Sequence, residues 1–267
     1  MSVFLIILAV IILLSIYMYI EAGWLKVSRI NFTKSSLGLK VLHISDIHIN
    51  LLRIRAEKVK EVIRQENPDI ILLTGDFIEK PVQTSVFLDF LQKIKQNNKT
   101  YLCLGNHDYK AYKDKNDGLE TFIREIRSHH AEVLINSSVH FEKNSVKYDL
   151  IGIDDLREGK PDVEKALAGC SPSSTKIAFS HNPDLVLQLS RKHADYFFCG
   201  HFHGGQIWAP FNLEFILLRK DKLCKNGIKR GLHKINGINA YLNRGLGNVV
   251  VPMRFLSRPE ISIYTIP

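Results

Sequence analysis

The sequence has few cysteines, and the four present are scattered at Cys103, Cys170, Cys199 and Cys224. No two of them form a Cys-x-x-Cys pair, which argues against a structural zinc site and against a disulfide scaffold. Cys103 and Cys199 lie within apolar runs, where a thiol is most simply a buried core side chain. The pattern therefore indicates a reducing compartment.

Internal repeats, low-complexity tracts and a linker between domains are also missing from the sequence. The chain has 267 residues, of which 45% are hydrophobic, so it can build one large domain or two small ones with a packed core. Without a visible linker, one domain is the simpler expectation.

Charge is missing from residues 3–20, where Ser15 and two tyrosines are the polar interruptions. This apolar run is just long enough to cross a bilayer. A cleaved signal peptide is the alternative, but a cationic start and a small-x-small cleavage site are both lacking. We therefore expect a retained membrane anchor at residues 1–22, a juxtamembrane linker at 23–38 and one folded domain at 39–267.

Basic residues follow the anchor, at Lys26, Arg29, Lys34 and Lys40, whereas only the α-amine precedes it. The positive-inside rule then places the folded domain of this single-pass protein in the cytoplasm, with Trp24 suited to the interface.

A second concentration of positive charge spans residues 208–254, which hold nine lysines or arginines against two acids, a net +7 of the chain's +9. Such a region can be a solvated face. Beside a membrane anchor it also suits anionic lipid headgroups or a phosphorylated substrate.

Downstream of the anchor, apolar patterns alternate between extended and helical segments. Strands are expected at 38–45, 69–74 and 100–104, separated by amphipathic helices at 53–65 and 85–96, and a polar loop at 110–118. This order predicts parallel strands covered by helices, an α/β fold. Further strands are expected at 132–135, 138–141, 146–153, 176–180, 194–199, 228–235, 238–243 and 260–265, and helices at 119–128, 162–168 and after Asn182-Pro183.

Five of the apolar runs end in residue types that bind metals. Asp46 and His48 stand two apart, so they face the same way if the strand continues through them. Because ligands gather at the carboxyl ends of strands in open α/β sheets, all these endings are expected in one crevice. Mixed carboxylate, imidazole and amide groups suit manganese, iron or zinc better than magnesium or calcium. The other four runs end at Asp76, at Asn106-His107-Asp108, at His181 and at His201-Phe-His203.

The order of these motifs resembles that of the calcineurin-like metallophosphoesterases. The resemblance runs from about residue 39 to the C-terminus. The anchor and the Gly-His-Phe-His-Gly-Gly-Gln206 segment are similar to the membrane-associated bacterial branch, which includes small phosphodiesterases and a UDP-2,3-diacylglucosamine pyrophosphatase. The matching motifs are Asp46-x-His48, Gly75-Asp76, Gly105-Asn-His-Asp108, His181 and Gly200-His-x-His203.

The resemblance implies a calcineurin-like metallophosphoesterase sandwich of two β-sheets flanked by helices, with two divalent metal ions that share Asp76. Manganese is the expected metal, with iron or zinc as alternatives. The implied ligands of the first ion are Asp46, His48, Asp76 and His203, and those of the second are Asp76, Asn106, His181 and His201.

The resemblance implies that His107 contacts the phosphate and assists the leaving oxygen. It also implies that Asp108 holds the His107 ring, although the family often has glutamate at this position. The Gly-Asp-Phe-Ile-Glu79 segment lacks the family's later aspartate. Two cations would lower the pKa of a bridging water, supply hydroxide for in-line attack on phosphorus and neutralise charge on the phosphoryl group.

Other polar residues near strand ends have simpler interpretations. Asp154-Asp155 follows a strand but occupies a place that the family does not use, so we expect a loop or capping pair. Structural roles are expected for the remaining histidines, because a lone histidine at a strand end is more often hydrogen-bonded than catalytic; they are His43, His129, His130, His140, His193 and His233.

The apolar segment at 207–218 bears on the substrate. It is either a core strand or an apolar lip at the bilayer that admits an acyl chain, with the basic cluster holding the headgroup. We expect a lipid-linked or nucleotide-linked phosphate substrate and contact with anionic lipids, and the oligomeric state stays open.

Three functions are compatible with the sequence. A membrane-anchored phosphodiesterase or pyrophosphatase is favoured, with the UDP-2,3-diacylglucosamine pyrophosphatase as a specific alternative. A nuclease of the same superfamily also suits the basic charge, but the anchor and the lack of interleaved aromatics count against nucleic acid. A non-catalytic scaffold would leave a complete ligand set buried without its metals, which is costly.

Overall fold

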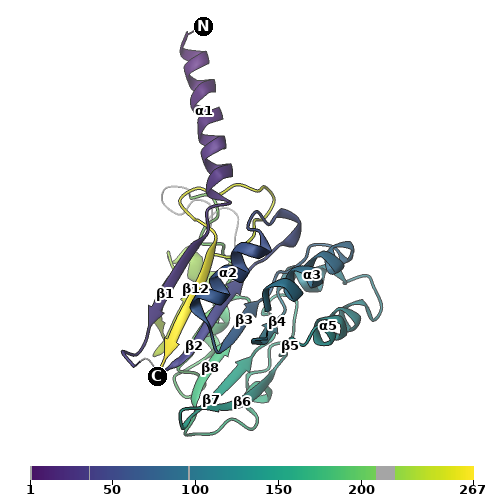
Figure 1. The fold of residues 1–267 in the computed structure, drawn as a ribbon, viewed down its shortest axis with the longest axis vertical. Helices are drawn as coiled ribbons and strands as arrows, with labels where there is room; N and C mark the ends of the chain where they lie inside the picture. Colours follow the sequence, from purple (N-terminus) through teal and green to yellow (C-terminus); the bar gives the residue numbers. More distant parts are fainter. Residues whose placement is uncertain (1, 36, 96, 209–219) are drawn as a thin grey trace.

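The computed structural model describes residues 2–35, 37–95, 97–208 and 220–267. An N-terminal helix, α1 (Ser2–Glu21), projects from a domain in which strands and helices alternate (Figure 1). The further described helices are η1 (Ile49–Leu51), α2 (Ala56–Glu66), η2 (Pro81–Gln83), α3 (Thr84–Lys95), α4 (Asn106–Ala111), α5 (Gly118–Ser128), α6 (Val163–Leu167), η3 (Pro183–Gln188) and α8 (Lys222–Lys225).

The strands of the described residues form two six-stranded sheets. The first has the spatial order β1 (Lys26–Asn31), β12 (Glu260–Ile266), β2 (Leu39–Ser45), β3 (Ile70–Thr74), β4 (Lys99–Cys103) and β5 (Glu132–Val133). The second has the order β10 (Gly231–Ile235), β11 (Ile238–Leu242), β9 (Tyr196–Cys199), β8 (Thr175–Phe179), β7 (Val146–Gly152) and β6 (Ser137–Lys143).

The parallel pairing predicted for the strands at 38–45, 69–74 and 100–104 is confirmed. β2, β3 and β4 pair in parallel, with Val41 opposite Ile70 and Ile70 opposite Lys99. β7, β8, β9 and β11 also run parallel, whereas β12 is antiparallel to β2. Parallel strands bring their carboxyl ends to one edge of each sheet, which is where the polar endings were expected.

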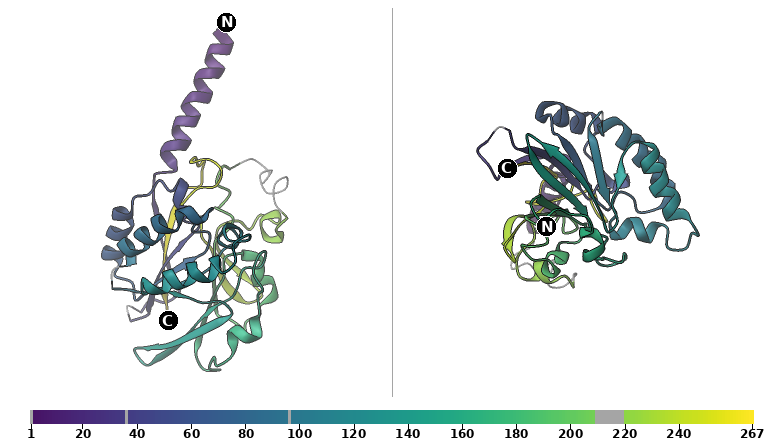
Figure 2. Two further views of the ribbon diagram at one scale, coloured as in Figure 1. Left: turned by 90° about the vertical axis from the view of Figure 1, so that its right-hand side faces the viewer. Right: turned by 90° about the horizontal axis from the view of Figure 1, so that it is seen from below.

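The core between the sheets is aromatic. Phe198 of β9 and Tyr264 of β12 stack with ring centroids 3.9 Å apart, and both are buried. The outer face of the first sheet is covered by α2, α3 and α5 (Figure 2), through buried side chains such as Val59, Phe87 and Phe122. A third apolar cluster joins η3, α6 and α8 to the second sheet. The predicted α/β sandwich of two sheets flanked by helices is therefore confirmed.

The interval 23–38 is not the linker that the sequence suggested. It contains β1, which pairs in parallel with β12, so that Lys26 lies opposite Glu260 and Asn31 opposite Thr265. Its sequence, Lys-Val-Ser-Arg-Ile-Asn, mixes charge with apolar residues because β1 is a half-exposed edge strand. The short strand ties the end of α1 directly to the first sheet.

A helix was missed at 106–111, where a loop was expected from residue 110 onward. α4 begins with the Asn106-His107-Asp108 motif, and the Asp108 carboxylate accepts the backbone N–H of Gly105 at 2.9 Å. An acidic residue at the third position of a helix that reaches back to its start is a known capping arrangement. At only six residues, α4 is too short for apolar periodicity to reveal it.

Replacing Phe198 with alanine is expected to lower the free energy of unfolding by about 3–5 kcal/mol, because the change leaves a cavity between the sheets. Urea unfolding of the purified chain in detergent, followed by circular dichroism, measures this. Val82→Ala is the matched control, since Val82 is 79% exposed and its loss should cost under about 0.5 kcal/mol. Equal unfolding curves for the two variants would contradict the assignment of this core.

Candidate metal centre

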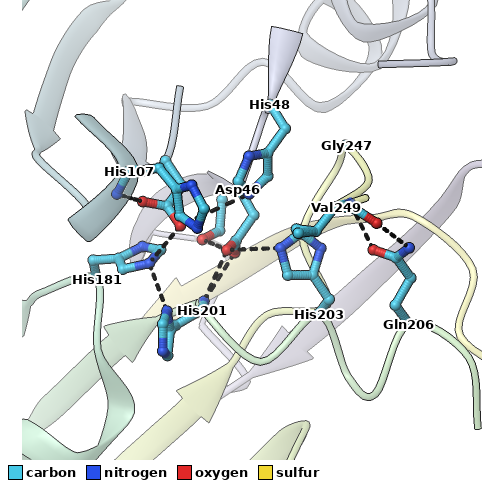
Figure 3. Close-up of polar contacts among 12 residues, drawn as sticks. Asp46, His48, His107, His181, His201, His203, Gln206, Gly247 and Val249 are labelled. Carbon is cyan, nitrogen blue, oxygen red and sulfur yellow. Dashed lines mark hydrogen bonds and ion pairs between the residues drawn. The ribbon is translucent and has the colours of Figure 1, made fainter. Parts of the chain in front are cut away.

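Every expected ligand lies at or just beyond the carboxyl end of a strand. Asp46 follows β2, Asp76 follows β3 and Asn106 follows β4, all in the first sheet. His181 follows β8 and His201 follows β9, both in the second sheet. The two sheets therefore contribute to one site, and Figure 3 shows Asp46, His181 and His201 pointing toward one another.

One group of possible ligands is Asp46, His48 and His203, whose ligand atoms all lie within 4.8 Å of one another. Nε2 of His203 is 3.2 Å from Oδ1 of Asp46, and the rings of His48 and His203 have centroids 5.1 Å apart. All three residues are buried. The geometry matches three of the four ligands expected for the first ion.

A second group is Asp76, His181 and His201, again with ligand atoms within 4.8 Å. Nε2 of His181 lies 3.0 Å from Oδ2 of Asp76 and 3.0 Å from Nδ1 of His201. Nδ1 of His181 donates to the Thr74 carbonyl at 2.9 Å, which leaves Nε2 as the nitrogen facing the cleft. This group matches three of the four ligands expected for the second ion.

Asp76 belongs to the second group and also lies close to His48 of the first group. Its Oδ2 is 3.0 Å from His181 Nε2 and 3.7 Å from His48 Nε2. In the part of the chain that the structure describes, Nε2 of His48 and Oδ1 of Asn106 are buried and have no hydrogen-bond partner. Such orphaned atoms are costly unless a cation is bound there, so the donor set fits two divalent metal ions.

The backbone at the site is left-handed at five of the expected ligands. The φ angles are 49° at Asp46, 38° at His48, 54° at Asp76, 70° at His201 and 51° at His203. Few side chains adopt this region, although Asp and His do so more readily than most. Clustered left-handed residues mark functional sites, because the surrounding structure must hold them.

Glycines allow the backbones to approach one another here. A Cβ at Gly105 would collide with the Asp76 carboxylate, and a Cβ at Gly200 would collide with Ser45 and Asp46. The missing side chains of Gly105 and Gly200 therefore leave room for the Asp76 and Asp46 carboxylates.

The electrostatics of the cleft favour positive charge. Burial alone would raise the pKa of Asp46, but the charge of His203 and its hydrogen bond hold that pKa well below the usual range. Burial would likewise lower the pKa of His181, yet the charge of Asp76 and its hydrogen bond raise that pKa to about 10. A cleft that draws a proton onto a buried imidazole would equally attract a metal cation.

Glu79 was not recognised as a site residue from the sequence. Its carboxylate accepts the Nδ1–H of His48 at 2.7 Å and the Nδ1–H of His107 at 2.6 Å. Burial would raise the pKa of Glu79, but the hydrogen bonds from these histidines lower it to about 2. Burial would lower the pKa of His107, but the hydrogen bond to Glu79 raises it. Glu79 therefore fixes the orientation of both rings, and its place three residues after Asp76 was the available signal.

The role expected for Asp108 was wrong. Its carboxylate does not hold the His107 ring, which binds Glu79 instead. It accepts backbone N–H groups of Asp76 at 2.9 Å and Phe77 at 2.8 Å, as well as that of Gly105. Asp108 therefore supports the left-handed turn that presents Asp76.

The residues given structural interpretations lie in hydrogen-bonded surroundings. His43 is buried between the hydroxyls of Tyr264 and Thr74, at 2.9 and 2.8 Å, and burial lowers its pKa to about 3, so its ring is neutral. Asp154 accepts the hydroxyl of Tyr109 and the backbone N–H of Lys160, as a loop-capping residue does.

A pocket of about 470 Å³ opens onto the site. Asp76, Asn106, His107 and His203 line its inner part, and Lys110 and Arg157 add positive charge. Most of the 207–218 segment, proposed as a lip or a core strand, lies outside the described residues; Ile207 also lines the pocket.

Comparisons with known proteins agree with the geometry. A family model described as calcineurin-like phosphoesterase matches residues 39–205. The uncharacterized metallophosphoesterase YkoQ of Bacillus subtilis is 30% identical over 85% of this chain and 83% of its own length. The phosphodiesterase YaeI of Escherichia coli is 28% identical over 92% of this chain and 89% of its own length. The UDP-2,3-diacylglucosamine pyrophosphatase LpxG of Chlamydia trachomatis is 28% identical over 92% of this chain and 90% of its own length.

Glu79→Gln is expected to weaken Mn²⁺ binding by about tenfold to a hundredfold, because the amide no longer sets the tautomer and orientation of His48. Isothermal titration calorimetry of the metal-stripped chain measures the affinity. Glu57→Gln, an exposed change on α2, is the control and should bind Mn²⁺ as the unmodified chain does. Unchanged binding by Glu79→Gln would show that Glu79 does not orient a ligand.

Proposed function

The chain belongs to the calcineurin-like phosphoesterases and is a metal-dependent phosphoester hydrolase, and from this premise we propose that it is a membrane-anchored phosphodiesterase or pyrophosphatase acting on a lipid-linked or nucleotide-linked phosphate. The observation that carries the proposal is the pair of buried ligand groups, one containing Asp76 and the other close to it, beside a pocket that Lys110 and Arg157 also line.

Two divalent ions are proposed to bind these groups, with manganese preferred over iron or zinc. Asp76 would be shared between them. Bound ions of this kind would lower the pKa of water to supply hydroxide at neutral pH and neutralise charge on the attacked phosphoryl group. The first ion is assigned to Asp46, His48, Asp76 and His203, and the second to Asp76, Asn106, His181 and His201.

His107 is the proposed proton donor to the leaving oxygen. Its ring is partly exposed to the pocket and its Nδ1–H is held by Glu79, so Nε2 is free to face the substrate. The raised pKa keeps a larger share of the ring protonated near neutral pH, the form that contacts phosphate and donates a proton. Lys110 and Arg157, at the pocket wall, would attract the anionic group.

Two activities that are narrower than this proposal are candidates. The similarity to LpxG over most of both chains favours hydrolysis of UDP-2,3-diacylglucosamine as one candidate substrate. A nuclease activity is the other, and we expect no nucleic acid partner because the proposed anchor restricts the site to a membrane surface.

The membrane anchor in the proposal is α1. Among the described residues, Val3–Glu21 is the segment long and apolar enough to cross a bilayer, and its side chains are exposed rather than packed against the domain. The basic residues that follow α1 favour a cytoplasmic domain.

Asp76→Asn is expected to reduce phosphodiester hydrolysis in the presence of Mn²⁺ by at least about a hundredfold, because the shared carboxylate supports both ions. The purified chain is assayed in parallel on a model phosphodiester, a UDP-linked acyl sugar and single-stranded DNA. Asp89→Asn, an exposed change on α3, is the matched control and should retain activity. Cleavage of DNA alone would overturn the proposed substrate class, and full activity of Asp76→Asn would overturn the proposed mechanism.

For the orientation, an alkaline phosphatase reporter fused after Pro267 is expected to be inactive in cells and a fluorescent protein at the same position to be bright, because the C-terminus would be cytoplasmic. An active phosphatase fusion would place the domain on the opposite side of the membrane.

A further inference from the structure

An apolar loop at residues 249–256 forms one wall of the active-site pocket. Val249, Val250 and Val251 line the pocket together with Ile207, and the expected metal ligands Asp76, Asn106, His201 and His203 line the same pocket. The loop also exposes large apolar side chains to solvent, since Val250 is 87% exposed and Leu256 49% exposed. A soluble enzyme seldom displays adjacent large apolar residues beside its site unless they contact another apolar surface.

The loop is held in this exposed conformation. The Gln206 side chain accepts the backbone N–H of Val249 at 2.8 Å and donates to the carbonyls of Val249 and Val251 at 2.9 and 3.1 Å (Figure 3). Val250 has a φ of 65°, a strained conformation for a β-branched side chain. Strain that the surrounding structure imposes at a pocket rim indicates a functional constraint on where Val250 points.

The position of the loop relative to α1 identifies what it would contact. The backbone N–H of Arg254 donates to the Met18 carbonyl at 3.0 Å, and the Phe255 ring meets the Tyr17 ring edge-on. Met18 lies three residues inside the end of the apolar segment Val3–Glu21, or about 5 Å along the helix axis. If α1 crosses a bilayer, this part of the loop lies at the boundary of the hydrocarbon (Figures 1 and 2).

Residues around the base of α1 are those of a membrane interface. The Arg53 guanidinium lies 3.3 Å from the centre of the Tyr19 ring, and that of Arg258 lies 4.2 Å from the centre of the Trp24 ring. Aromatic rings are enriched at the headgroup level, and arginines there attract anionic lipids. The loop and the base of α1 therefore form one continuous surface.

We propose that the exposed apolar side chains of the 249–256 loop form a membrane-inserting lip, through which the pocket opens at the bilayer surface to an amphiphilic phosphate ester. The acyl part of the substrate stays in the bilayer against Val250 and Val251 while its phosphate reaches the metal centre. This inference rests on the proposed function and narrows its substrate to a lipid-linked phosphate. A water-soluble nucleotide substrate would have no use for an apolar rim.

Insertion is tested without relying on catalysis. The full-length chain with Val250→Trp is reconstituted in vesicles of phosphatidylcholine and phosphatidylglycerol, some with brominated acyl chains that quench tryptophan. Val82→Trp, placed at an exposed apolar position on η2, is the control on the same background of Trp24 and Trp208. Extra quenching of Val250→Trp relative to Val82→Trp is expected, and equal quenching would overturn the lip.

The substrate route is tested with Val250→Ser in the same vesicles with Mn²⁺, on two esters that share a leaving group. Hydrolysis of dioleoylglyceryl p-nitrophenyl phosphate should fall about tenfold relative to hydrolysis of soluble bis(p-nitrophenyl) phosphate. Val82→Ser should alter neither rate. Equal effects of Val250→Ser on both esters would contradict the proposal that the substrate enters the pocket past the lip. A parent chain that cleaves neither ester would instead refute the proposed function, and the quenching result would still decide whether the lip inserts.

Discussion

The carboxylates of Asp46 and Asp76 are buried where the carboxyl edges of the two sheets meet, and the site is arranged to compensate their charge. A buried carboxylate without donors or cations nearby is costly. His203 lies against Asp46, and His181 and the backbone N–H of His107 lie against Asp76. The carboxylates are shared across the seam between the sheets, so a cation bound to them also joins the two halves of the sandwich.

Buried side chains that are not expected metal ligands hold the expected ligands in place. Arg254 is fully buried, donates to the carbonyls of Arg244 and Ser257 at 2.9 and 2.8 Å, and places Nη2 3.5 Å from Nδ1 of His203. Burial lowers the pKa of Arg254 to about 10, so the guanidinium is still charged at neutral pH. Asp108 supports Asp76, because its carboxylate accepts the backbone N–H groups of Asp76, Phe77 and Ile78 in the turn that presents Asp76. Arg254 therefore combines charge compensation with backbone support, whereas Asp108 provides backbone support alone.

The sequence was informative where an apolar run ends at a candidate metal ligand. Apolar runs that stop at Asp46, Asp76 or His181 predicted both the parallel strands and the edge at which their ends meet, because strand direction alone brings those ends together. The partners of side chains were not predictable, since they depend on rotamers and turns that spacing does not encode. For this reason the sequence assigned the His107 ring to Asp108, whereas Glu79, for which no role was expected, binds it. Arg254 was counted as one charge in a basic stretch, and nothing in its neighbours distinguishes a buried guanidinium from an exposed one.

The largest difference between expectation and structure concerns the anchor. A helix on a flexible linker would leave the domain free to turn relative to the membrane, whereas β1 pairs with β12 and Glu21 accepts the N–H groups of Leu256 and Ser257 at 3.0 and 2.9 Å. Ser257 in turn donates to the His203 carbonyl at 2.8 Å. The base of α1 thus belongs to the shell that positions an expected metal ligand. Because these contacts fix the angle between α1 and the domain, any bilayer crossed by α1 sets the height at which the pocket opens, and with it the depth from which a substrate can reach the metal centre.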